Sequence, residues 1–237
     1  MKRLLVLSVL FSSVFLSCTN DPEPEPEVIR SYCYLYHFIP DLGSVIWEVD
    51  EAEVPNAQLY ADVFLGGVIL ETTQEEIAFT VKHPWTKEVL ISQLFQLEQD
   101  KYYNVIVGGP EEDPTLLFKE IDTSPPMQGM VKFQVLHAIP DQNLIDLYMG
   151  GTTPDKKVVT ALDFIDLSDP FEAKDIDVRA AITVSAHSEE YNQDSVLLTS
   201  VNNEEIITGA NYLSVLAPST FEPLSDLTTW MYILPLE

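Results

Sequence analysis

The sequence predicts an all-β protein made of two consecutive domains, each an antiparallel β-sandwich. Two observations carry this prediction. Apolar and polar residues alternate with a period of two over residues 131–135 and 178–187, which is typical of strands with one buried face. The signature His-x-Ile-Pro-Asp occurs at residues 37–41 and again at 137–141. A repeat of about a hundred residues has the size of one domain.

Further runs rich in β-branched and aromatic residues are bounded by Gly, Pro, Asn or Asp, and we expect them to be strands. They span residues 102–107, 212–216 and 230–234. Residues 89–97 fit either a helix or a strand, and the neighbouring runs favour a strand. Many short strands with regular turn signals are typical of antiparallel sandwiches.

The predicted domains cover residues 29–124 and 127–237, with paired prolines at the boundary. A similar string follows each signature, DVFLGG in the first domain and DLYMGG in the second. The first string begins 21 residues after the aspartate of its signature, and the second begins only 5 residues after. This difference predicts an insert at about 43–58 in the first domain, long enough for an extra hairpin.

The start of the chain has the features of an export signal. In residues 1–17, Lys2 and Arg3 precede an apolar run that is too short to span a bilayer. Cys18 follows directly, and this order resembles the lipobox of bacterial lipoproteins, in which the cysteine carries a diacylglycerol. We therefore expect lipid attachment at Cys18, which anchors the protein to a membrane. An ordinary signal peptide with an incidental cysteine is the alternative.

Residues 18–28 alternate proline and glutamate, which favours an extended tether. An acidic stretch after a lipidated cysteine also resembles the export signal of surface lipoproteins in the Bacteroides group. This resemblance implies a lipid-anchored outer-membrane protein that faces the medium, with the periplasmic face as the alternative. Cys33 is the other cysteine of the chain and is interpreted as a small buried residue.

The formal net charge is −26. So acidic a chain repels phosphate backbones, which argues against nucleic acid as a partner. Solubility at a crowded surface accounts for the charge in the simplest way, and affinity for calcium is the second interpretation.

A family resemblance rests on the region after the predicted boundary. Residues 131–141 and 145–150 resemble the start of a bacterial domain of unknown function, V-x-V-x-H-A-S-P-D-A followed by V-D-V-Y and a glycine. Isoleucine replaces the serine of that pattern at Ile39 and Ile139, so the chain is a divergent member. The resemblance implies tandem immunoglobulin-like sandwiches in an extracytoplasmic lipoprotein.

The two signatures supply histidine and aspartate, which are possible metal ligands or acid–base groups. Proline followed by aspartate is ordinary turn chemistry, however, and a folding signal has to recur in each copy of a domain. We therefore interpret the motif as a repeated structural turn. Its residues are His37, Pro40, Asp41, His137, Pro140 and Asp141.

An acidic stretch in the second domain contains the weak calcium candidates Asp163, Asp166 and Asp169. It lacks the D-x-D-x-D-G spacing of a calcium loop, so a solvated acidic loop is the favoured interpretation and no metal or cofactor is predicted.

Trp47, in the expected insert, and Trp85, in His-Pro-Trp, are candidate ligand contacts because exposed indole rings stack on sugars or fill a partner's pocket. Trp230 lies in a predicted strand and is expected in the core.

Nucleophile elbows, phosphate loops, H-E-x-x-H and C-x-x-C are absent from the sequence. We expect a noncatalytic protein that is held at the bacterial envelope and binds an unknown protein or glycan, in adhesion or as a scaffold. The alternatives are a glycan-binding accessory lipoprotein of a polysaccharide uptake system, with exposed, coplanar tryptophans, and a hydrolase without a recognisable motif.

Overall fold

The computed structural model describes residues 27–56, 58–60, 67–74, 76–139, 142–174, 177, 182–187, 197–201, 207–218 and 227–234. Apart from a 3₁₀ turn at Pro154–Lys156, the regular elements described are strands, and the all-β prediction is confirmed. None of the described helical segments has the length and apolar character needed to cross a membrane.

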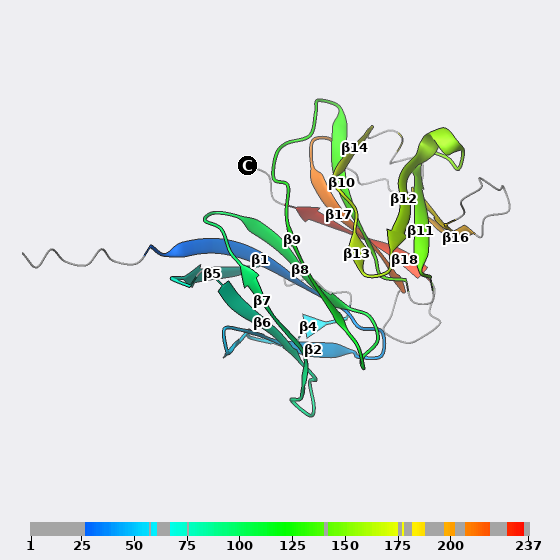
Figure 1. Ribbon diagram of the computed structural model, residues 1–237. Coiled ribbons are helices and arrows are strands. Elements are labelled where there is room, and N and C mark those ends of the chain that lie inside the picture. Colours follow the sequence, from blue (N-terminus) through cyan, green and yellow to red (C-terminus); the bar gives the residue numbers. More distant parts are fainter. Residues whose placement is uncertain are drawn as a thin grey trace, which may run out of the picture.

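The strands form two successive groups, which lie side by side in Figure 1. The first half contains β1 (Ile29–Phe38), β2 (Ser44–Val49), β3 (Ala52–Glu53), β4 (Gln58–Leu59), β5 (Val68–Thr72), β6 (Glu76–Lys82), β7 (Val89–Gln96), β8 (Tyr102–Gly108) and β9 (Thr115–Glu120). The second half contains β10 (Met130–His137), β11 (Leu144–Met149), β12 (Lys157–Asp163), β13 (Asp166–Leu167), β14 (Phe171–Lys174), β15 (Ile182–Ala186), β16 (Leu197–Val201), β17 (Asn211–Pro218) and β18 (Leu227–Leu234).

Each half has two sheets with equivalent strand orders. The first half has β5-β1-β8-β9 and β3-β2-β6-β7, and the second has β13-β10-β17-β18 and β12-β11-β15-β16. In both halves the first strand pairs in parallel with a late strand, β1 with β8 and β10 with β17. The prediction of antiparallel sheets is therefore wrong for these two pairs of strands, whereas the other described pairs are antiparallel. Residue alternation reveals a strand but carries no information about the direction of its partner.

An apolar core fills the space between the two sheets of each half. In the first half, Leu35 of β1 and Val105 of β8 meet Trp47 of β2 and Phe79 of β6. In the second half, Val135 of β10 lies in the corresponding cluster with Leu147 of β11 and Val184 of β15. These residues are the inward positions of alternating strands, so the periodicity of the sequence determines which face is buried.

The expected insert at 43–58 is not an insert. β2 begins seven residues after His37, as β11 begins seven residues after His137. β2 pairs with β6 as β11 pairs with β15, and β3 and β4 together occupy the place of β12 beside it. The prediction failed because it aligned two similar strings, DVFLGG and DLYMGG. The backbone instead keeps a constant spacing of 100 residues through this part of the repeat.

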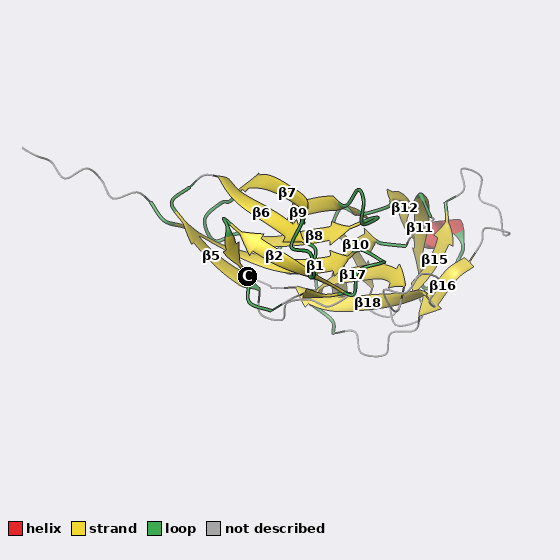
Figure 2. Ribbon diagram, turned by 90° about the horizontal axis from the view of Figure 1, so that it is seen from below, coloured by secondary structure: helices red, strands yellow, loops and turns green. Residues whose placement is uncertain are grey.

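A third apolar cluster joins the two halves. It combines Tyr36, Phe38 and Ile106 of the first half with Leu136 and Val215 of the second, all at most 1% exposed. In β1 these side chains alternate with residues of the first core, so the strand is buried on both faces. Figure 2 shows β1 and β8 next to β10 and β17 in the middle of the molecule. The outer faces of two sheets thus form a continuous core between the domains.

The segment between β9 and β10 is fastened to the second half. The ammonium group of Lys132 donates to Asp122 Oδ2 at 2.7 Å and to the Ser124 carbonyl oxygen at 2.6 Å. Asn211 Nδ2 donates to the carbonyl oxygen of Asp122 at 2.9 Å. Lys132 holds the pKa of Asp122 below its usual value, because its hydrogen bond and charge favour the carboxylate. The linker is therefore a bonded element of the fold.

Candidate functional site

The signature histidines are both used within the fold. His37 is fully buried at the end of β1. Its Nε2 lies 2.9 Å from the carbonyl oxygen of Leu42, and its Nδ1 accepts the amide of Ile39 at 3.2 Å. Because Nδ1 accepts, Nε2 carries the proton and donates to Leu42, and the ring is neutral. Burial lowers the pKa of His37 to about 4.

His137 repeats this arrangement. Its Nε2 donates to the carbonyl oxygen of Gln142 at 2.8 Å, its Nδ1 accepts the amide of Ile139 at 3.2 Å, and burial lowers its pKa to about 4. An aromatic ring packs edge-on against each imidazole, Tyr60 in the first half and Phe164 in the second. With both ring nitrogens occupied, neither histidine is available to bind a metal or to transfer a proton.

The other residues of the two signatures are less fully described. Pro40 is half-buried and Asp41 is exposed at the turn of the first half. Pro140 and Asp141 lie outside the described residues, as do Cys18 and the predicted tether up to residue 26.

The three calcium candidates do not form a metal site. Asp163 ends β12, Asp166 lies in β13, and Asp169 follows it. Among the described residues, no three His, Cys, Asp or Glu side chains come close enough together to hold a metal ion, and all three aspartates belong to that described set.

The prediction of a ligand contact at Trp47 is wrong. Trp47 is 1% exposed and belongs to the core of the first half, where its counterpart in the second half is Leu147. It was placed at the surface because residues 43–58 were interpreted as an insert, whereas β2 is a central strand of its sheet.

Trp85 is presented to solvent. It is 83% exposed, more than any other large apolar side chain in the described structure. It lies in the turn between β6 and β7, and His83 holds this turn from within. His83 Nδ1 accepts the amides of Trp85 and Thr86, both at 3.2 Å, and its backbone amide donates to the Glu88 carbonyl oxygen at 2.9 Å. The indole is therefore displayed on a backbone with a defined shape. We call residues 83–88 the Trp85 turn.

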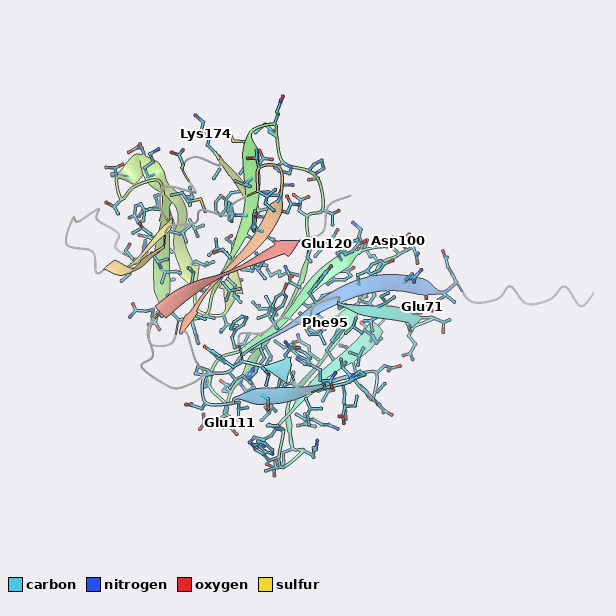
Figure 3. All side chains as sticks on the ribbon, turned by 180° about the vertical axis from the view of Figure 1, so that it is seen from behind. Glu71, Phe95, Asp100, Glu111, Glu120 and Lys174 are labelled. Carbon is cyan, nitrogen blue, oxygen red and sulfur yellow. The ribbon has the colours of Figure 1, made fainter. Side chains whose placement is uncertain are left out.

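The Trp85 turn lies at the far end of the first half from Ile29, where β1 begins. His83 Nε2 lies 3.7 Å from Glu111 Oε1, in the loop after β8. β1 and β8 run in parallel, so the end of β8 is also the end of β1 that is remote from Ile29. Figure 3 shows the same separation, with Glu111 at one end of the first half and Glu71, which is opposite Arg30 at the start of β1, at the other. Ten residues of strand separate these ends by about 33 Å.

A buried polar cluster in the second half escaped the sequence analysis. Asp146 of β11 is 1% exposed and accepts three hydrogen bonds, from Lys157 Nζ at 2.8 Å, from the Ala161 amide at 3.0 Å and from His187 Nδ1 at 2.8 Å. Burial opposes ionisation of Asp146, but these bonds outweigh it and hold its pKa below the usual value. The three donors come from positions 11 to 41 residues away in sequence, so local patterns carry no signal for the cluster.

The pairing of Asp146 with His187 has the geometry that orients a catalytic imidazole, but no hydrogen bond from a hydroxyl nucleophile to His187 is found among the described residues. Ser185 is the described serine nearest to His187 in sequence, and its buried hydroxyl has no hydrogen-bond partner in the described structure. Two residues apart on one extended strand lie about 6.6 Å apart, beyond hydrogen-bond reach. The cluster is best explained as a stabilising ion-pair network on the outer face of its sheet.

Comparison with known families gives the following match. Residues 31–148 match the family described as "Domain of unknown function (DUF4397)". The match begins in β1 and ends in β11, so it includes the first half from Ser31 on, the linker and the second histidine signature. The predicted resemblance to a domain of unknown function is confirmed over these residues. No match is found among curated proteins.

Proposed function

We propose that this protein is a noncatalytic binding protein of the bacterial envelope, anchored by a lipid on Cys18 to the outer membrane and facing the medium. In this proposal each half is an immunoglobulin-like sandwich and the Trp85 turn contacts a partner. The basic and apolar leader, the cysteine that follows it and the Pro/Glu tether support the anchoring. The paired sheets of equivalent strand order support the sandwich assignment.

The observation that carries the proposal is the geometry of Trp85. An indole that is 83% exposed gains nothing for folding, and His83 orders the turn that displays it. Tryptophan is among the residues that contribute most to binding energy at interfaces, because it buries a large area with few rotatable bonds. With an anchor before Ile29, the turn is the end of the first half that extends away from the membrane.

The positions of the two tryptophans favour a protein ligand over a glycan ligand. A sugar platform of two coplanar tryptophans requires Trp47 beside Trp85, and Trp47 is buried. A single exposed indole fits a partner protein with an apolar pocket instead. Glu88 belongs to the turn and Glu111 lies next to it, so we expect basic side chains around that pocket. A protein partner is therefore the leading proposal, and a glycan is the second.

A binding comparison on intact cells tests the proposal. The full-length protein is produced in its host cells with Trp85→Ala or with Leu94→Ala, a matched loss of an exposed apolar side chain on the neighbouring strand β7. We expect the unaltered protein and Leu94→Ala to cross-link to the same partner and Trp85→Ala to lose it. Equal cross-linking by all three would contradict the proposal.

A glycan array separates the two ligand classes. The purified full-length protein in mild detergent is applied with and without calcium, and Trp85→Ala serves as the comparison. Under the leading proposal the array is blank. A specific sugar signal that Trp85→Ala abolishes would instead establish the glycan-binding function.

A further inference from the structure

A groove of about 530 Å³ opens between the two sheets of the first half, between β3 and β5. We call it the β3–β5 groove. Its floor is part of the core itself, Val54, Leu70 and Ile77, each less than 10% exposed. Ile69 on the β5 side is 51% exposed. Covering such an apolar floor removes apolar area from water, which favours the binding of an apolar segment.

Both sides of the groove are sheet edges. In the described structure β5 pairs with β1 alone and β3 pairs with β2 alone, so each has one side without a partner strand. Such an edge presents backbone N–H and C=O groups that are ready to pair with another extended chain. β5 contributes five residues, about 17 Å of strand, to this edge.

The second half also has a groove, of about 430 Å³, between β12 and β13, but the edge strand has a different course in the first half. There the chain leaves β3 at Glu53 and passes through Pro55 and Asn56, which has a φ of 70°, before β4 begins. In the second half a single strand, β12 from Lys157 to Asp163, occupies the same place, with Ala161 at a φ of 50°. Proline removes a backbone donor and a left-handed residue turns the chain, so the edge beside the groove is interrupted.

The rim of the groove is acidic. Asp50 and Glu53 lie on the β3 side and Glu71 on the β5 side. Arg30, 3.5 Å from Glu71, is an exposed counter-charge next to them. Residues 18–28 of the same chain contain four acidic side chains and are repelled by this rim, which excludes the tether as the natural occupant.

From the edge, the floor and the rim together, we propose that the β3–β5 groove binds an extended basic peptide segment of another protein, which adds to β5 as a further strand. Alternate side chains of such a strand point to opposite faces. One set of apolar side chains covers Val54, Leu70 and Ile77, and the other set carries lysine or arginine toward the rim carboxylates. This is recognition by strand addition, in which main-chain bonds provide affinity and alternate side chains provide specificity.

This site is independent of the Trp85 turn. β3 and β7 are opposite edges of one sheet, β3-β2-β6-β7, and the Trp85 turn adjoins β7. The two proposals can therefore fail separately.

The probe is a fluorescein-labelled seven-residue peptide that alternates lysine and valine, titrated with the full-length protein and followed by fluorescence anisotropy. The altered protein carries Glu53→Lys and Glu71→Lys. Its matched control carries Glu112→Lys and Asp113→Lys, the same change of charge at exposed positions in the loop after β8. We expect the first pair to weaken binding about tenfold or more and the control pair by less than about twofold. Equal weakening by both pairs, or no binding by the unaltered protein, would overturn the proposal.

Two further probes test the mode of binding. A peptide with alternate backbone nitrogens methylated keeps its charge but cannot pair as a strand, and a lysine–serine peptide keeps its charge but lacks apolar side chains. We expect both to bind at least about tenfold more weakly than the lysine–valine peptide. Unchanged affinity for either one overturns binding by strand addition onto an apolar floor. Trp85→Ala leaves lysine–valine binding unchanged under this proposal, and a loss of binding in that variant would overturn the separation of the two sites.

Discussion

The Nε2 atom of His37 donates to the carbonyl oxygen of Leu42 at 2.9 Å, and in doing so it closes the turn between β1 and β2 from inside the core. The same bond recurs 100 residues later, from His137 to Gln142 at 2.8 Å. A buried neutral imidazole that satisfies one backbone carbonyl and one backbone amide is thus the element common to both halves.

Replacing this imidazole should destabilise the protein. We expect His37→Ala to lower the free energy of unfolding by about 2–4 kcal/mol, because it leaves a cavity and strips the Leu42 carbonyl and the Ile39 amide of a partner. Urea denaturation measures the change, with the exposed Lys174→Ala as control. A loss below about 0.5 kcal/mol would show that the imidazole does not hold the turn.

The same histidines predict a loss of stability in mild acid. Burial lowers the pKa of both rings to about 4, from an ordinary value of 6.5. Between these values the unfolded chain binds protons that the folded chain does not, so the free energy of unfolding falls as the pH falls. The contribution is fully present above pH 6.5 and is lost progressively down to about pH 4, by about 3 kcal/mol for each ring.

Proton NMR checks this prediction directly. The ring protons of His37 and His137 should show no titration step above about pH 5, while their signals remain those of the folded protein. A titration midpoint near 6.5 for either ring would contradict its buried, neutral state.

The cluster between the halves predicts that they unfold as one unit. Ile106 of β8 and Leu136 of β10 are both fully buried there. Hydrogen exchange should give β6 and β15, which lie in different halves, the same opening free energy, and Leu136→Asp should lower it for both by placing a charge in an apolar core. Leu94→Ala on the surface is the control and should change neither. Two well-separated opening energies in the unaltered protein would show that the halves are independent.

The two tryptophans should behave oppositely. Trp47→Ala removes a buried side chain and should cost about 3–5 kcal/mol in the free energy of unfolding, whereas Trp85→Ala should change it by less than about 0.5 kcal/mol. Thermal unfolding followed by circular dichroism measures both. A large loss from Trp85→Ala would mean that this indole serves the fold rather than a partner.

The strands and the repeat could be predicted from the sequence, because period-two alternation and the histidine signature are local signals. The run 89–97 fits either a helix or a strand by its sequence, and its residues Val89–Gln96 form β7. The sequence of β1 also indicates that both faces of this strand are buried. Tyr34, Tyr36 and Phe38 are large apolar residues on the face opposite Leu35. This pattern predicts that another part of the protein covers this face, but it does not identify the second half as that part.

The candidate site was less predictable, because its parts meet only through tertiary pairing. Trp47 and Trp85 are the same residue type, but Trp47 is buried and Trp85 is exposed. The difference arises because Trp47 lies on β2, a central strand of its sheet, whereas Trp85 lies in a turn. The hydrogen bond of Asp146 with His187 joins residues 41 positions apart. The β3–β5 groove depends on two edges from different sheets, which no spacing rule brings together.

Photo-cross-linking from position 85 tests the central claim, that the Trp85 turn is a contact surface, most directly. A photoreactive phenylalanine analogue is placed at position 85 or, as a control, at position 94 in the full-length protein on its host cells. The account predicts one discrete adduct from position 85, suppressed by an excess of the unaltered protein, and none from position 94. The same adducts from both positions, or none from position 85 while the protein remains folded, would contradict it.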